Sequence, residues 1–229
     1  AHHTVLKENA AGNFFVNDRC IDCGTCYAHA PRLFTDASDH AYVARQPQTE
    51  SERRLALEAL HSCPVHAIGQ HEKDALSGDV LASFPVRLED NIYFCGFANE
   101  ATFGASSYLI RRDGGNVLVD MPRFYPKLIQ GIEKLGGVKY IFLTHSDDIA
   151  GHEEFAKHLG AERIIHSNER VSSRMEIRIE GSEPVQFATD LRIIPTPGHT
   201  RGSMCLLFDE ALFTGDHLAA GRTGGLRAC

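Results

Sequence analysis

Three of the seven cysteines in this chain are spaced at intervals of three residues, at Cys20, Cys23 and Cys26. This spacing lets one short loop aim three thiolates at a single metal centre, and Cys63 is followed by Pro64, as is typical of the remote fourth ligand of a four-iron, four-sulfur (4Fe-4S) cluster. A disulfide pair or a tetrahedral zinc site is the alternative. The absence of a secretory signal disfavours the first, and zinc favours paired Cys-x-x-Cys units. Because no second run of this kind follows, the sequence predicts one 4Fe-4S cluster.

A second group of side chains able to bind metal lies in the segment 144–152, which reads THSDDIAGH. His145, Asp147 and Asp148 follow a short apolar run, and Asp148 and His152 are four residues apart, a spacing that would place both on one helix face. Mixed imidazole and carboxylate ligands suit iron, manganese or zinc. In the alternative interpretation the segment binds no metal, and His145 and Asp148 only cap the helix and form local hydrogen bonds.

The elements that must position the cysteines follow from hydrophobic periodicity. Over 51–63, Leu55, Leu57 and Leu60 stand near helical spacing, so we expect a helix that carries the fourth cysteine toward the cluster. This segment has no capping-box glutamate three residues after its first serine. A polar, glycine-containing stretch near 70–82 predicts a linker between two domains.

Beyond this linker the pattern changes to short apolar strands and helices. The residues 113–116, Asp-Gly-Gly-Asn, are a strong hairpin signal between two of the strands. Strands that alternate with helices predict a layered α/β architecture. We expect strands over 91–97, 106–112, 116–120, 139–145 and 163–167, and helices over 124–137 and 148–162.

From about residue 14 to residue 68 the chain resembles single-cluster ferredoxins. The resemblance rests on FFVNDRCIDCGTCYAHAPRLF, then a variable stretch, then a helix before HSCPVHAI. It implies that Cys20, Cys23, Cys26 and Cys63 hold the cluster and that one electron is carried at a time.

From about residue 90 to residue 218 the chain resembles the metallo-β-lactamase fold, in which loops at one edge of a two-sheet sandwich supply metal ligands. The resemblance rests on SSYLIRRDGGNVLVD, PTPGHTRGS and TGD. It implies that His199 is a metal ligand, that Asp216 bridges two metals, and that one or two divalent ions, zinc or iron, are bound. The expected fold class is an α+β ferredoxin-like domain over 1–80 joined to an αββα metallo-β-lactamase-like sandwich over 81–229.

The first ligand motif of that family, His-x-His-x-Asp-His, is altered in this chain. If the motif is aligned on His145, Asp147 takes the place of the second histidine. If it is aligned on 148–151, His145 becomes the second histidine, Asp147 keeps the aspartate, and Asp148 replaces the last histidine. Both alignments leave His145, Asp147 and Asp148, with the nearby His152, as candidate metal ligands.

The family pattern also continues past the Thr-Gly-Asp element to further strands and a last ligand histidine. This sequence ends at Cys229, thirteen residues after Asp216 of that element. We therefore expect that a C-terminal part is missing, and that the final residues 221–229, GRTGGLRAC, form a loop.

Charge and hydropathy limit the partners. The net charge is −7, the pI is near 6.0, and no run of lysine or arginine is present, so we expect no nucleic-acid or anionic-membrane partner. Without a long apolar stretch or a secretory pattern, we expect a protein of the cytoplasm or the plastid stroma. The partners that remain are a small-molecule substrate and a redox partner protein.

Three classes of function fit these features. In a metal-dependent hydrolase of an ester, thioester or related bond, Asp147 would hold or deprotonate the attacking water. In a redox protein, the cluster would pass single electrons to a carboxylate-rich metal site, much as flavodiiron proteins combine an electron donor with a metallo-β-lactamase-like core, although no flavin-binding segment is visible. In a non-catalytic module, the metal site would be degenerate. The identity of the bound metal separates the first two classes.

Overall fold

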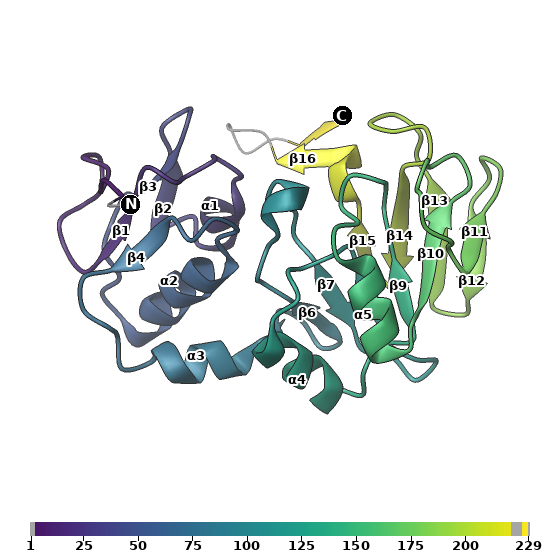
Figure 1. Cartoon of the computed structure of the whole chain (residues 1–229), viewed down its shortest axis with the longest axis horizontal. Coiled ribbons are helices and arrows are strands. Elements are labelled where there is room, and N and C mark those ends of the chain that lie inside the picture. The colour runs from purple at the N-terminus through teal and green to yellow at the C-terminus, as the bar shows by residue number, and fades with distance from the viewer. Residues whose placement is uncertain (1–2, 221–225, 229) are drawn as a thin grey trace.

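The computed structural model describes residues 3–220 and 226–228 and has two lobes side by side, as Figure 1 shows. The N-terminal lobe has the predicted α+β ferredoxin-like composition, because two short antiparallel strand pairs, β1 with β4 and β2 with β3, pack with two helices. Its elements are β1 (Phe14–Val16), α1 (Thr25–His29), β2 (Phe34–Asp36), β3 (Ala41–Val43), α2 (Glu50–Ser62) and β4 (Ile68–Gln70).

Helix α2 begins one residue before the predicted start, and its cap explains the difference. Thr49 Oγ1 accepts a hydrogen bond from the backbone N–H of Glu52 (3.2 Å), and the Glu52 carboxylate accepts one from the backbone N–H of Gln48 (2.7 Å). These bonds satisfy free donors at the helix N-terminus much as a capping box does. The helix expected from the leucine spacing is present, with Leu57 fully buried and Leu55 37% exposed.

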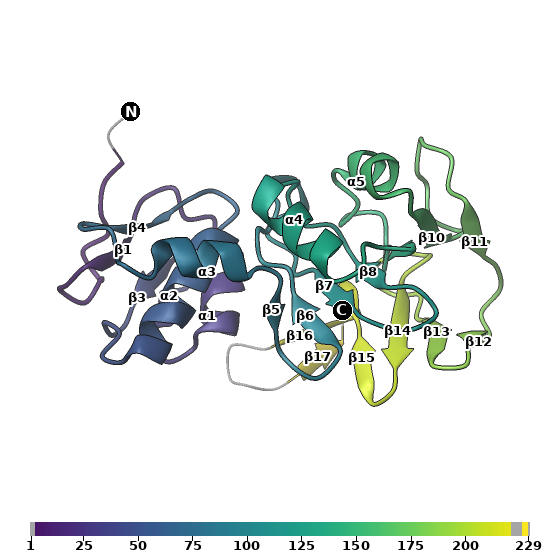
Figure 2. The ribbon, with the colours of Figure 1, turned by 90° about the horizontal axis from the view of Figure 1, so that it is seen from below.

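The predicted linker near 70–82 contains a helix, α3 (Ser77–Ser83). Figure 2 shows α3 beside α4 (Pro126–Lys134) where the two lobes meet. This close approach requires Gly131 on α4, because a Cβ atom there would collide with the carbonyl oxygen of Phe84. One continuous cluster of buried apolar side chains runs from the N-terminal lobe through this junction into the C-terminal lobe. The lobes therefore share a core, and the domain boundary after residue 80 stays a prediction.

The C-terminal lobe is a sandwich of two sheets, with strand orders β11-β10-β9-β8-β7-β6-β5 and β12-β13-β14-β15. Helices α4 and α5 cover the outer face of the first sheet, and apolar side chains such as Phe142 and Ile193 fill the space between the sheets. These are the two sheets and one helical layer of the predicted αββα sandwich. The elements besides α4 are β5 (Val86–Arg87), β6 (Ile92–Phe94), η1 (Glu100–Thr102), β7 (Tyr108–Ile110), β8 (Val117–Val119), β9 (Tyr140–Phe142), α5 (His152–Leu159), β10 (Glu162–His166), β11 (Ile177–Ile179), β12 (Val185–Ala188), β13 (Leu191–Pro195), β14 (Met204–Phe208) and β15 (Ala211–Phe213).

The strand directions in the first sheet decide where polar side chains gather. The predicted hairpin at 113–116 joins β7 and β8 in antiparallel pairing. Strands β8, β9 and β10 run parallel, so their carboxyl ends meet at one edge. Asp120 follows β8 and His145 follows β9 at this edge, which is where open α/β sheets bind ligands.

The tail forms a small hairpin after the 3₁₀-helix η2 (Gly215–His217). Strand β16 (Leu218–Ala220) pairs antiparallel with β17 (Leu226–Ala228). The prediction of a loop over 221–229 is therefore wrong for residues 226–228, because their backbone pairs with β16, while residues 221–225 and 229 lie outside the described residues. None of the helices in the described ranges combines the length and the apolar content that crossing a bilayer requires.

Candidate cluster site and metal centre

The cysteine side chains predicted to hold the cluster converge on one enclosed cavity in the N-terminal lobe. Two of the sulfur atoms accept backbone hydrogen bonds, Cys20 Sγ from Ala41 N–H (3.3 Å) and Cys63 Sγ from Ala67 N–H (3.2 Å). Hydrogen bonds of this kind to cluster sulfurs stabilise negative charge on them. The cysteines that line the cavity are Cys20, Cys23, Cys26 and Cys63.

The electrostatics of this cavity fit a positively charged metal centre. Burial, followed by repulsion from the three neighbouring thiolates, raises the pKa of Cys26, and burial raises the pKa of Cys23. Thiolates this close together repel one another, and cations between them would offset this repulsion. The thiol donor set and its enclosure therefore fit a 4Fe-4S cluster.

Loops of the C-terminal lobe contact the cluster loops directly. The Thr25 hydroxyl lies 3.4 Å from Cys23 Sγ and donates a hydrogen bond to the carbonyl oxygen of Gly104 (2.8 Å). Gly104 has a φ of +84°, and a Cβ atom there would collide with the Cys23 side chain, so only glycine allows this approach. Arg123 donates a hydrogen bond to the carbonyl oxygen of Pro64 (3.3 Å), next to the fourth cysteine.

The second group of predicted ligands meets at the edge of the sandwich. His145 follows β9, His199 lies between β13 and β14, and Asp216 lies in η2; one ligand atom from each lies within 4.8 Å of the others. Asp216 Oδ2 is 3.7 Å from His145 Nε2 and 3.6 Å from His199 Nε2. Asp147 Oδ2 lies 3.3 Å from His199 Nε2 and 3.9 Å from His145 Nε2. Four side chains therefore surround a space suited to a metal ion.

The tautomer of His145 is set by a chain of hydrogen bonds behind it. The Asp120 carboxylate accepts hydrogen bonds from the Thr144 hydroxyl (2.9 Å) and the Thr144 backbone N–H (2.8 Å). Since the Thr144 hydroxyl gives its only proton to Asp120, its oxygen accepts a hydrogen bond from His145 Nδ1–H at 2.9 Å. The opposite nitrogen, Nε2, is then unprotonated, and it is buried without a hydrogen-bond partner. A lone pair held in this way fits a metal ligand.

Two buried carboxyl groups lie beside these ligands. Burial raises the pKa of Asp148 to about 8, with further increases from the carboxylates of Asp120, Asp216 and Asp147. Burial likewise raises the pKa of Asp120 to about 7, although the hydrogen bonds from Thr144 oppose the shift. A cation at the centre would offset this accumulation of negative charge, so the donor set fits a divalent metal ion.

Comparison with known proteins identifies the families to which the two parts of the chain are similar. The sequence profile of the metallo-beta-lactamase superfamily matches residues 101–228, more than half of the chain, and that of the "4Fe-4S single cluster domain of Ferredoxin I" matches residues 16–70. The chain belongs to the metallo-β-lactamase superfamily. It carries a single-cluster ferredoxin domain in addition, and that domain implies a 4Fe-4S cluster.

Curated relatives cover the superfamily region. A hydroxyacylglutathione hydrolase of Anaeromyxobacter dehalogenans is 32% identical over 126 residues, which are 53% of this chain and 49% of that protein. The lactamase-like protein aptB of Emericella nidulans is 29% identical over 131 residues, which are 50% of this chain and 40% of that protein. The matched part of the chain therefore spans half or less of the length of these relatives.

Two of the solved structures that match part of this chain are metallo-β-lactamases. The subclass B3 metallo-β-lactamase BJP-1 of Bradyrhizobium japonicum has 21% identity and a TM-score of 0.40, over 55% of this chain and 58% of that one. The enzyme GOB-18 of Elizabethkingia meningoseptica has 19% identity and a TM-score of 0.41, over 55% of this chain and 57% of that one.

One predicted ligand of the superfamily domain lies apart from the others. His152 Nδ1 is 3.1 Å from Arg163 Nη1, and His152 Nε2 is 3.2 Å from the Ser173 hydroxyl, so both ring nitrogens have partners outside the metal group. Helix α5 begins at His152 itself, so Asp148 lies in the preceding turn and does not share a helix face with His152. Asp148 stays near the site, with Oδ2 4.0 Å from His145 Nδ1.

Two further carboxylates, Asp120 and Glu169, support the predicted ligands, and neither is among the candidates from the sequence. Asp120 stands at the end of a predicted strand, and this position was its only sequence signal. Glu169 holds the loop that carries His199, a predicted ligand, because it accepts hydrogen bonds from the Gly202 backbone N–H (2.7 Å) and from the Thr200 hydroxyl. Burial alone would raise the pKa of Glu169, but these hydrogen bonds, with those from Ser146, lower it.

Proposed function

We propose that this protein is a metal-dependent hydrolase of an ester, a thioester or a related bond. The observation that carries the proposal is the buried, unpartnered Nε2 of His145, which faces Asp216 and lies in one group with His199. The similarity to hydroxyacylglutathione hydrolases supports a thioester as the bond that is broken. The ions we propose are one or two of zinc or iron, held by His145, His199 and Asp216.

The residues around the site can supply the proton transfer that hydrolysis needs. A divalent ion bound there would lower the pKa of a water to about 7 and polarise the carbonyl group of the substrate. Asp147 is 61% exposed and lies beside His199, where its carboxylate can hold the water and accept its proton. Asp120 and Thr144 keep the His145 tautomer fixed, and the buried carboxyl group of Asp148 lies behind the ligands.

Metal analysis and thiol release from a thioester test this proposal. We expect the anaerobically purified protein to contain one or two ions beyond the irons of the cluster, and His199→Ala to lose both these ions and at least about 100-fold in kcat/KM. Asp147→Asn should keep the metal and lower kcat by about 100-fold or more. His158→Ala, which alters an exposed histidine on α5, is the matched control. A protein with cluster iron only would instead be the non-catalytic module.

A redox function is the second candidate. The observation that favours it is that Cys23, a predicted cluster ligand, and Asp216, a predicted metal ligand, line the same cleft. Iron in the second site, together with oxidation of the dithionite-reduced cluster on addition of a substrate, would support single-electron transfer supplied by a redox partner protein. Zinc in the second site would rule this candidate out, because zinc does not change its oxidation state in proteins.

A further inference from the structure

A cleft of about 670 Å³ separates the two predicted centres. Its volume falls in the range of about 300–1,000 Å³ that small-molecule sites occupy. One wall comes from the N-terminal lobe, at Cys23 and at Ala28 on α1, the helix that faces the C-terminal lobe in Figure 1. The other wall includes Asp120, Asp148 and Asp216 from the metal centre. A molecule in this cleft would therefore touch both lobes.

Apolar side chains gather in this cleft although they are exposed to solvent. Among the described residues, five large apolar side chains are exposed, and three of them line the cleft: Leu88 (50% exposed), Phe103 (63%) and Leu212 (47%). Phe103 has a φ of +50°, a conformation that aromatic residues rarely adopt, and it precedes Gly104 at the cluster loop. Exposed apolar groups that gather beside polar ligands are typical of binding sites.

The charged side chains that line the cleft are all acidic. Its ionisable carboxyl groups are Glu89, Asp120, Asp148 and Asp216, and the described residues that line it include no lysine, arginine or histidine. A metal ion would offset part of this charge at one end only. Apart from Glu89, these groups lie at the metal centre, so a substrate with several negative charges would find no cationic partner along the rest of the cleft.

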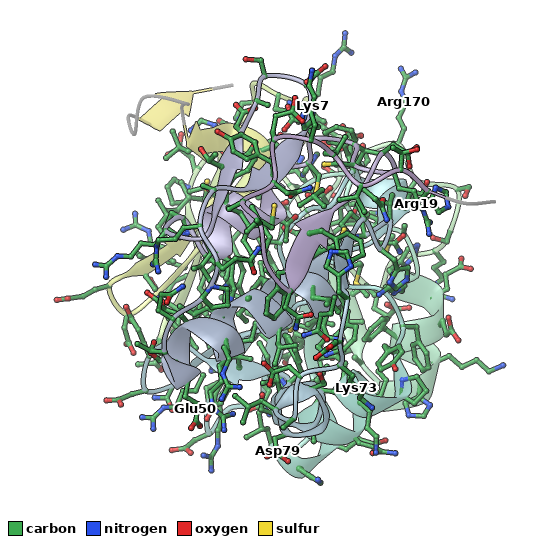
Figure 3. The ribbon with its side chains drawn as sticks, turned by 90° about the vertical axis from the view of Figure 1, so that its left-hand side faces the viewer. Lys7, Arg19, Glu50, Lys73, Asp79 and Arg170 are labelled. Carbon is green, nitrogen blue, oxygen red and sulfur yellow. The ribbon has the colours of Figure 1, made fainter. Side chains whose placement is uncertain are left out.

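The cationic side chains near the metal centre lie in a different opening. Arg170 and Arg201 line a separate pocket with Glu169, and Figure 3 shows Arg170 extending away from the body of the molecule. An anionic substrate would find cationic partners at that opening and none in the cleft.

We propose that the interlobe cleft binds the substrate of the metal centre, and that this substrate is an uncharged thioester or ester with an apolar acyl group. This proposal rests on the proposed hydrolase function and specifies its substrate class. The apolar acyl chain would lie against Leu88, Phe103 and Leu212, and the N-terminal lobe would form the opposite wall. In the reaction, the water oxygen bonds to the acyl carbon, the carbon–sulfur bond breaks, and the thiol leaves with one of the two water protons.

The first test compares thioesters that differ in one property. We expect kcat/KM for S-hexanoyl-N-acetylcysteamine, which is neutral, to exceed that for S-hexanoylglutathione, which is anionic, by at least about tenfold. We also expect it to exceed that for S-acetyl-N-acetylcysteamine by at least about tenfold, because the longer chain buries more apolar surface. Leu212→Ser should reduce the preference for the longer chain, whereas Leu55→Ser, at an exposed leucine outside the cleft, should keep it.

The second test measures binding without turnover. Calorimetry with the uncleavable thioether S-hexyl-N-acetylcysteamine should detect binding to the full-length protein. Ala28→Trp, which fills the cleft from the N-terminal lobe, should weaken this binding at least about tenfold. Ala75→Trp, at an exposed alanine outside the cleft, should leave the binding unchanged.

The two tests separate failure of the cleft from failure of the proposed function. If no thioester is hydrolysed but the thioether binds and Ala28→Trp weakens the binding, the hydrolase proposal fails and the cleft as a site for apolar ligands stands. If S-hexanoylglutathione is the better substrate and Arg201→Gln removes that preference, hydrolysis stands and the cleft proposal is overturned. It is also overturned if the wild-type protein does not bind the thioether.

Discussion

Thr144 is the residue on which the tautomer of the proposed ligand His145 depends. Thr144→Val keeps the shape of the side chain but removes the hydroxyl between Asp120 and His145 Nδ1. We expect about 10–100-fold weaker binding of the second-site metal, measured by competition with a chelator, and unchanged cluster iron. Ser173→Ala, which removes a hydroxyl from His152 outside the site, is the matched control. Equal metal affinity in Thr144→Val and the wild type would contradict this role.

The residues found from sequence are those that stand in local motifs. His199 and Asp216 lie in short motifs of the superfamily, and the structure brings both close to His145. Asp120 could not be found in this way, because its contact with Thr144 joins residues 24 positions apart. That contact exists only because parallel strands end at the same edge, which is a property of the folded sheet.

The helix boundary explains why Asp148 and His152 do not share a helix face. Gly151, with a φ of +89°, precedes the first residue of α5, so the helix begins too late to include Asp148. Sequence spacing alone predicts a shared face only if the helix covers both residues, and boundaries are less certain than the existence of an element.

Substitutions at two helical glycines test how tightly α3 and α4 pack where the lobes meet. A Cβ atom on Gly131 of α4 would collide with the Phe84 backbone, whereas a Cβ atom on Gly78 of α3 would meet nothing within 4 Å. We expect Gly131→Ala to lower the free energy of unfolding by about 1–3 kcal/mol, and Gly78→Ala to raise it by up to about 1 kcal/mol. Anaerobic chemical denaturation of the cluster-containing proteins measures both. An unchanged free energy of unfolding in Gly131→Ala would show that the segment at Phe84 can move away from α4 at little cost.

At the level of elements, the sequence predicted a structure correctly where its local residue preferences were strong, and incorrectly where tertiary packing decides the structure. The Asp-Gly-Gly-Asn turn at 113–116 predicted a hairpin because its residues favour that turn, and the structure contains it. Helix α3 was predicted as part of a linker because the polar, glycine-containing stretch around it has the composition of a loop. Its stability comes from packing between α2 and α4, a tertiary contact that composition does not report.

At the scale of the whole molecule, the sequence predicted two centres and their ligands in separate parts of the chain. The cleft between them could not be predicted, because it depends on contacts between residues far apart in sequence. The hydrogen bond from Thr25 to Gly104, which joins the cluster loop to the C-terminal lobe, links residues 79 positions apart. Such long-range contacts accompany the shared core, so the two lobes form one structure in which residues of the C-terminal lobe lie beside the predicted cluster.

Arg123 provides a way to measure how the C-terminal lobe affects the predicted cluster. This C-terminal-lobe residue contacts the Pro64 carbonyl oxygen, and attraction to the thiolate of Cys63 opposes the burial that lowers its own pKa. A positive charge near a cluster favours the added electron, so Arg123→Gln should lower the reduction potential by on the order of tens of millivolts. Redox titration of the full-length protein measures this shift.

Matched variants separate the charge of Arg123 from its packing. Arg123→Lys keeps the positive charge and should hold the potential near that of the wild type. Arg87→Gln removes an exposed arginine of the same lobe, which pairs with Asp90, and should leave the potential unchanged. If Arg123→Lys and Arg123→Gln shift the potential equally, the effect arises from altered packing around Pro64, and the C-terminal lobe does not tune the cluster through this charge.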